Sequence, residues 1–149
     1  VMLASYCAGY DVFTLQLTRG YSGEQFREDL KMLYEKLAAK PTTFLFTDAH
    51  VVEENFLESI NNFLNTGSVP GLFEKDEIDG WVNRTRKEAK LMAGATTSTE
   101  IWQYFLQKTR DNMHIVLAMS PSGDSLRIRC RNFPGMVSQC VIDWFYTWP

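Results

Sequence analysis

The feature that most constrains the fold of this chain is the apolar run Thr43-Phe44-Leu45-Phe46-Thr47, which ends abruptly at Asp48. A continuous apolar run of this length is typical of a strand buried on both faces of a parallel α/β sheet. Ligands of such sheets bind at the carboxyl ends of the strands, so Asp48 is expected at the binding edge. A carboxylate there can hold Mg²⁺, directly or through water, beside nucleotide phosphates.

An apolar strand that ends in Asp is the Walker B half of a P-loop nucleotidase. The other half is missing, because the chain contains no G-x-x-x-x-G-K-[ST] loop to hold the phosphates. The Walker B Asp is commonly followed by a Glu that orients water, but here Ala49 and His50 follow. Glu53 and Glu54 are expected to be acids of the first helical turn. The pattern predicts nucleotide binding with doubtful hydrolysis, and a helix-capping or turn Asp48 is the alternative.

Composition narrows the possible classes of protein. The chain has 149 residues, about one domain, and a net charge of −3, which argues against a nucleic-acid partner. No apolar run approaches the ~20 residues that span a bilayer, and no signal-peptide pattern is present, so we expect no membrane partner and a cytoplasmic or cytoskeletal location. Cys7, Cys130 and Cys140 lack metal-ligand spacing and are expected to be reduced and mostly buried.

The order of periodic segments predicts one α/β domain with a mostly parallel sheet and flanking helices. Between Ser22 and Lys40, apolar residues recur at helical spacing on one face: Phe26, Leu30, Leu33, Tyr34 and Leu37. The acidic and then basic segment 74–93 is expected to form a surface helical insert. The other expected helices cover 2–8, 53–65, 99–112 and 125–131, and the expected strands cover 12–17, 42–48, 114–120 and 141–145.

Two further groups of residues could act on a nucleotide. Arg127, Arg129 and Arg131 lie in the basic region 124–134, where Arg127 and Arg131 share one helix face and Arg129 points elsewhere. A guanidinium here could serve as an arginine finger for the γ-phosphate of a neighbouring module, or the region could be a solvated basic turn. Ser120 lies at the tip of the expected strand 114–120, at the place of a polar sensor residue in AAA+ proteins, and a simple Ser-Pro turn is the alternative.

Several segments taken together resemble a dynein heavy chain, and most closely the fourth AAA+ module of the axonemal (ciliary) type. The resemblance runs essentially from end to end. It is carried by Leu-Ala-Ser-Tyr-Cys-Ala-Gly-Tyr at 3–10 and by the segments 25–31, 44–51, 58–73, 112–121 and 129–135.

The resemblance implies the large α/β subdomain of an AAA+ P-loop module without its first strand, its P-loop and its helical lid. The implied parent is an ATP-driven microtubule motor whose AAA+ modules form a ring, with a regulatory fourth module. Its implied cofactors are ATP or ADP with Mg²⁺, none of them bound tightly by this chain alone. Its implied partners are neighbouring AAA+ modules, microtubules and dynein intermediate and light chains, in the axoneme of cilia and flagella.

Carried over by position, Asp48 is the Walker B aspartate and Ser120 the sensor. Arg129, with Arg131 as the second candidate, would be the finger that reaches the third module's nucleotide, and it is expected to face that module instead of its own site. Ala49 replaces the hydrolytic Glu, so turnover is expected to be slow or absent. Without the P-loop strand, we expect a gap in the sheet beside the Asp48 strand. The alternative is a structural or interaction piece that binds no nucleotide.

Overall fold

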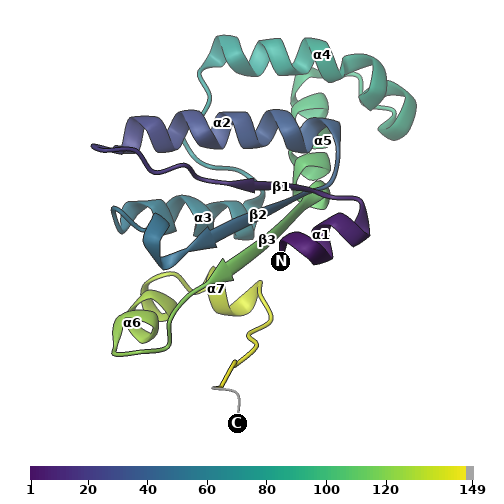
Figure 1. The fold of residues 1–149 in the computed structure, drawn as a ribbon. Helices are drawn as coiled ribbons and strands as arrows, with labels where there is room; N and C mark the ends of the chain where they lie inside the picture. The colour runs from purple at the N-terminus through teal and green to yellow at the C-terminus, as the bar shows by residue number, and fades with distance from the viewer. Residues whose placement is uncertain (147–149) are drawn as a thin grey trace.

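A computed structural model describes residues 1–146, in which three parallel strands form one sheet in the order β1-β2-β3 (Figure 1). The strands are β1 (Asp11–Thr14), β2 (Thr42–Thr47) and β3 (Met113–Ala118). The helices, including the short 3₁₀ turn η1, are α1 (Met2–Ala8), α2 (Gly23–Ala39), η1 (Asp48–His50), α3 (Asn55–Thr66), α4 (Lys75–Ala93), α5 (Ser98–Asn112), α6 (Ser125–Asn132) and α7 (Gly135–Ser138). The expected α/β class with a parallel sheet is confirmed.

The Asp48 strand is the central strand of this sheet. Phe44 lies opposite Phe13 of β1 and Ile115 of β3, and both pairings are parallel. The expected gap beside the Asp48 strand was therefore wrong. The two neighbours of β2 are strands of the chain itself, and the open edges of the sheet lie on β1 and β3.

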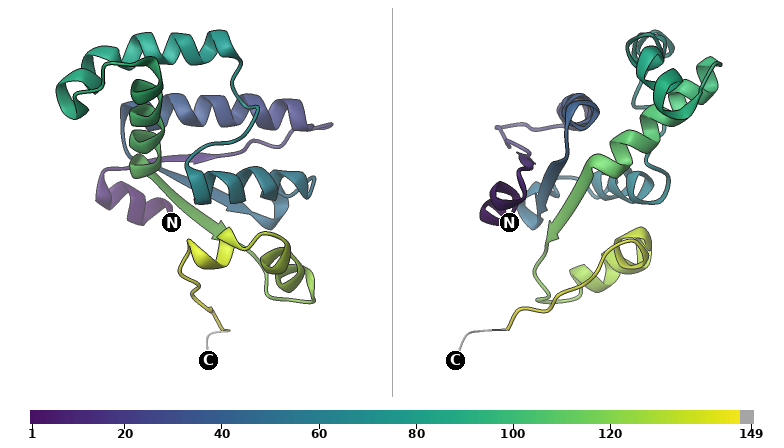
Figure 2. Two further views of the ribbon diagram at one scale, coloured as in Figure 1. Left: turned by 180° about the vertical axis from the view of Figure 1, so that it is seen from behind. Right: turned by 90° about the vertical axis from the view of Figure 1, so that its right-hand side faces the viewer.

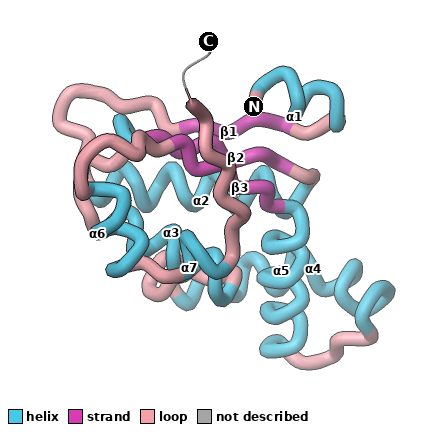
Figure 3. Tube along the Cα trace, turned by 90° about the horizontal axis from the view of Figure 1, so that it is seen from below, coloured by secondary structure: helices cyan, strands magenta, loops and turns pink. Residues whose placement is uncertain are grey.

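The main core lies between one face of the sheet and helices α2, α3 and α5 (Figure 3). Phe44 and Phe46 of β2 are completely buried on this face. The apolar stripe predicted for α2 is buried as expected: Phe26, Leu30, Leu33, Tyr34 and Leu37. On the opposite face α1 contributes a polar contact, in which Ser5 Oγ donates to Thr43 Oγ1 at 2.9 Å.

The segment 74–93 forms α4, which packs against α5 away from the sheet (Figure 2). A second, smaller core holds the two helices together: Val82, Ala89, Ala95 and Ile101. Lys108 Nζ also forms an ion pair with Glu88 Oε1 at 2.7 Å. This helix pair is thus attached to the sheet mainly through α5.

The expected strand at 141–145 was wrong. After α7 the described chain continues without regular structure, and the side chains of Val141, Trp144 and Phe145 are exposed. An apolar run becomes a strand only where a partner takes up its backbone hydrogen bonds, and within residues 1–146 this segment has no strand partner.

The cysteines also differ from the expectation, because Cys7 is exposed while Cys130 and Cys140 are half-buried, all three as free thiols. None of the described helices has the length and apolar character needed to cross a membrane.

Candidate functional site

The candidate site forms where β2 and β3 end side by side. Thr47 lies opposite Ala118 in the parallel register, so the residues that follow each strand come close together. β2 gives way to the turn η1 at Asp48, and Nδ1 of His50 accepts a hydrogen bond from the Thr47 N–H at 3.0 Å. This turn holds the Asp48 carboxylate at the carboxyl edge of the sheet, where the sequence predicted it.

Ser120 meets Asp48 through its backbone. The Ser120 N–H donates to Asp48 Oδ2 at 2.5 Å, although the two residues lie 72 positions apart. The hydroxyl of Ser120 is used inside its own turn, where Oγ accepts from the Ser122 N–H at 3.2 Å. The structure thus brings the two predicted residues together, with a serine turn at the end of β3.

Arg129 also lies in this site. Its Nη1 donates to Asp48 Oδ1 at 2.7 Å, and its Nη2 donates to Glu54 Oε1 at 3.1 Å. The Arg129 side chain is only 15% exposed, against 40% for Asp48 and 62% for Glu54. We expected Arg129 to face a preceding module of the ring, but in this chain it faces its own Asp48, because two carboxylates converge on it here.

Arg131 lies outside the site. Its side chain is exposed, and among residues 1–146 it forms no ion pair. Arg127 is also exposed, and its ion-pair partner within the described part of the chain is Asp124, at 3.7 Å. The helical spacing correctly separated Arg129 from the other two arginines, and the structure adds that Arg129 is the one that reaches the end of β2.

Glu54 is the member of the site that sequence reasoning missed. It was interpreted as a first-turn acid, and it does occupy the N-cap of α3. Its carboxylate nevertheless accepts from both Nε and Nη2 of Arg129, at 3.3 and 3.1 Å. The sequence did contain a signal for this role. Glu54 follows Asp48 by only a short turn, so its carboxylate stays at the same edge of the sheet.

A second contact anchors the segment that carries Arg129. The Gly135 N–H at the start of α7 donates to Asn61 Oδ1 of α3 at 2.8 Å. Met136 is buried in the main core. Helix α6, by contrast, has no buried residue, so the Arg129 ion pairs and the flanking α7 determine its position.

His50 adds no positive charge to the site at neutral pH. Burial lowers the pKa of His50 below its ordinary value, which favours the neutral imidazole that accepts from Thr47. The ring also lies against Phe46, with the ring centroids 5.5 Å apart. Arg129 is therefore the cation that balances the carboxylates of Asp48 and Glu54.

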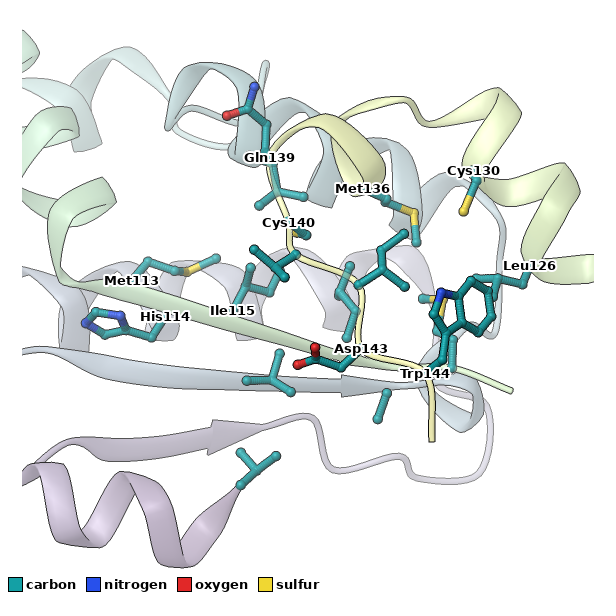
Figure 4. A pocket seen from close by; sticks show the side chains of 18 of the residues that line it. Met113, His114, Ile115, Leu126, Cys130, Met136, Gln139, Cys140, Asp143 and Trp144 are labelled. Atoms are coloured by element: carbon teal, nitrogen blue, oxygen red, sulfur yellow. The ribbon is translucent and has the colours of Figure 1, made fainter. Parts of the chain in front are cut away.

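A groove of about 900 Å³ follows the open edge of β3 (Figure 4). It is lined on one side by the strand itself, including Ile115 and Leu117, and on the other by Met136, Val141 and Trp144. At its far end the lining includes residues 119 and 121, which flank Ser120. The groove thus runs beside an unpaired strand edge toward the Asp48 site.

The donor set suits Mg²⁺ better than a transition metal. Asp48 offers carboxylate oxygens, and no group of three or more His, Cys, Asp or Glu side chains gathers as a metal site in residues 1–146. Mg²⁺ commonly takes one or two carboxylates and completes its shell with water and substrate phosphates. One exposed carboxylate at the end of a parallel strand fits that habit.

The comparisons with known proteins identify the family of the chain. The family described as "P-loop containing dynein motor region D4" matches residues 1–149. The dynein-1-alpha heavy chain of the flagellar inner arm I1 complex of Chlamydomonas reinhardtii is 52% identical over 149 residues. Human dynein axonemal heavy chains 10 and 6 are 52% and 47% identical. Each alignment covers 99% of this chain but only 3–4% of the relative. The chain therefore belongs to the dynein heavy-chain family, in the D4 region of the motor.

Proposed function

We propose that this chain supplies the Walker B and sensor part of the fourth AAA+ module of an axonemal dynein ring, which binds Mg²⁺–nucleotide in a regulatory role. The observation that carries the proposal is the position of Asp48 at the carboxyl end of the central strand, bonded to the backbone of Ser120 at the end of the next strand. Nucleotides bind parallel α/β sheets at this edge.

Asp48 is the residue that would hold Mg²⁺, and the ion would supply charge neutralisation for the phosphates. Hydrolysis is expected to be slow or absent because, among the described residues, the two that follow Asp48 and the nearby Glu54 offer no free base. Ala49 has no acid group, His50 is bonded to Thr47, and Glu54 is paired with Arg129. Binding without rapid turnover suits a regulatory site.

The groove beside β3 suggests where the phosphate-binding loop of the heavy chain would lie. An unpaired strand edge next to an apolar groove favours the addition of another strand. We propose that in the heavy chain a strand that carries the P-loop pairs with β3 here. Its loop would then emerge near Ser120 and Asp48, at the same edge of the sheet.

The activity of the whole protein is proposed from its relatives. They are named as axonemal and flagellar dynein heavy chains, so the parent is proposed to be an ATP-driven microtubule motor of the ciliary axoneme. Its proposed partners are neighbouring AAA+ modules, microtubules, and dynein intermediate and light chains.

One observation favours a second candidate, a structural piece of the ring that binds no nucleotide. Arg129 already neutralises the Asp48 carboxylate, as it would in a purely structural ion pair. In that case Asp48 would stabilise α6 and would have no metal to hold.

Substitution of Asp48 in a motor ring that contains this module separates the two candidates. Asp48→Asn removes one charge from the proposed metal site, so Mg²⁺–nucleotide occupancy of the fourth module should fall while turnover at the first module persists. Asp124→Asn is the matched control, because that carboxylate is 75% exposed at the N-cap of α6 and pairs with Arg127 instead of Arg129. Unchanged occupancy after Asp48→Asn would favour the structural candidate.

A further inference from the structure

We propose that Arg129 and Mg²⁺–nucleotide are alternative partners of Asp48, so that nucleotide binding at this module releases helix α6. The inference rests on the proposed function, because it assumes that Asp48 is the metal-holding carboxylate. It adds a regulatory consequence, namely that the position of Arg129 depends on whether nucleotide is bound.

Both oxygens of Asp48 are already engaged. Oδ1 accepts from Arg129 Nη1 at 2.7 Å, and Oδ2 accepts from the Ser120 N–H at 2.5 Å. The Ser120 contact is neutral and compatible with a nearby cation. The Arg129 contact is not, because it would place a guanidinium and a divalent ion on one carboxylate within a few ångströms, where like charges repel.

The contacts of α6 allow Arg129 to leave without unfolding the core. Its hold on the body of the protein is ionic, and one of its two partners, Glu54, is 62% exposed. None of the residues of α6 is buried. Gly123, with a φ of 73°, precedes the helix. Beyond the helix, α7 remains fixed by the Gly135–Asn61 hydrogen bond. Release would therefore let α6 move about Gly123 while α7 stays in place.

Release also gives the guanidinium a second use. While it is paired with Asp48 and Glu54, Arg129 cannot offer its planar set of donors to another anion. Once displaced, it becomes a free bidentate donor at the surface of the module, suited to phosphate oxygens. The proposed finger would thus be available to a neighbour only when its own module is loaded.

Thermodynamic linkage turns this competition into a measurable affinity. If Mg²⁺–nucleotide must displace Arg129, the ion pair lowers the apparent affinity, and its removal must raise it. For a partly exposed pair of this kind, the expected gain is about two- to fivefold. Loss of the Arg129 charge also leaves the site more negative, which acts in the same direction.

The first experiment measures Mn²⁺ binding by electron paramagnetic resonance in a motor ring with ADP present. The signal that Asp48→Asn removes defines the site of this module. Arg129→Gln should tighten that site about two- to fivefold. Arg131→Gln, which removes an exposed arginine of the same helix, should leave its affinity unchanged. Equal affinities in the unsubstituted, Arg129→Gln and Arg131→Gln rings would overturn the inference alone.

The second experiment needs no substitution at Arg129. Backbone hydrogen exchange of residues 125–132 in the unsubstituted ring should rise severalfold when Mg²⁺–ADP is added, while residues 135–138 stay protected. The rise should disappear in Asp48→Asn. Binding of Mn²⁺ without any change in exchange of 125–132 would overturn the inference and leave the proposed function standing. Absence of an Asp48-dependent Mn²⁺ site would overturn both.

Discussion

Asn61 and Gly135 approach so closely that a side chain at 135 would force the amide of Asn61 to move. The Gly135 N–H donates to Asn61 Oδ1 at 2.8 Å, and a Cβ at 135 would lie 2.7 Å from the same oxygen. This contact joins α7 to α3 just beyond the helix that carries Arg129. The contact therefore fixes the chain on the C-terminal side of α6 and helps to position the Arg129 guanidinium beside Asp48.

We expect Gly135→Ala to lower the free energy of unfolding by about 1 kcal/mol, because the Asn61 amide must turn away and its hydrogen bond with the 135 N–H is lost. Gly80→Ala is the matched control. Gly80 lies within α4 with nothing near the added methyl, so this substitution should stabilise the chain by up to about 1 kcal/mol. Urea denaturation of both variants measures the difference. Two variants of equal stability would contradict the close contact.

The two faces of β2 should respond differently to truncation. Phe44 is completely buried between the sheet and its covering helices, whereas Leu45, which points to the other face, is only half-buried. Phe44→Ala should cost about 3–5 kcal/mol, and Leu45→Ala should cost less than half of that. Denaturation midpoints with unchanged slopes would report the two costs. A larger loss of stability from Leu45→Ala than from Phe44→Ala would contradict the assignment of the core to the Phe44 face of the sheet.

Local patterns were sufficient to predict the strand β2, the buried face of α2 and the place of Asp48 at the end of that strand. Each depends on periodicity or on the end of an apolar run, which neighbouring residues determine. The partner of Arg129 could not be predicted in this way, since Asp48 and Glu54 lie 81 and 75 positions away in the chain. Helical spacing gave the face of Arg129 but not what that face meets.

The mistaken strand at 141–145 has a related cause. Alternating or continuous apolar residues show that a segment can pair, but pairing also requires a free edge at hydrogen-bonding distance. In the described structure this segment lines the groove beside β3 without joining the sheet. The position of β2 between two strands likewise follows from the order of the sheet, which no local pattern contains.

The stability of the chain should fall on mild acidification because of His50. Its pKa is lowered in the folded state by burial, so below about pH 6.5 the unfolded chain binds a proton that the folded chain does not. The free energy of unfolding should therefore decrease as the pH falls from 7 toward 5. His50→Asn keeps a hydrogen-bond acceptor for Thr47 and should remove this part of the slope.

Urea denaturation across that pH range measures the effect. The acids whose pKa values are lowered, including Glu88 and Glu100, add a slope of the same sign near pH 5, and the comparison with His50→Asn separates it from that of His50. The pH dependence of the free energy of unfolding should weaken in His50→Asn, both in the natural chain and in a chain in which His114, the other histidine, is also replaced. If the pH dependence persists in His50→Asn with and without His114, it does not come from His50.

The isolated chain should associate through the open edge of β3. That edge lies beside an apolar groove, and Phe145 and Val141 are 90% and 91% exposed next to it. Phe145→Asp should reduce association in sedimentation velocity runs at several micromolar concentrations. Leu91→Asp, at an equally exposed site on α4, should leave association unchanged. A chain that stays monomeric throughout would show that the edge is already protected.

The finger role proposed for Arg129 is tested by hydrolysis in the neighbouring module. Arg129→Lys keeps the charge but loses the planar bidentate donors, so single-turnover hydrolysis in the third module, with the main site disabled, should slow markedly. A complete finger is worth roughly 10³-fold or more in rate.

Because Arg129 is paired with Asp48 in the chain described here, the defect should appear when the fourth module holds Mg²⁺–nucleotide and should be small when it is empty. Arg131→Lys is the matched control, because Arg131 is exposed on the same helix. A defect in Arg131→Lys alone would transfer the finger to that residue. If neither substitution slows hydrolysis in the third module, neither arginine acts as a finger. The role of Arg129 is then confined to its ion pairs within its own module.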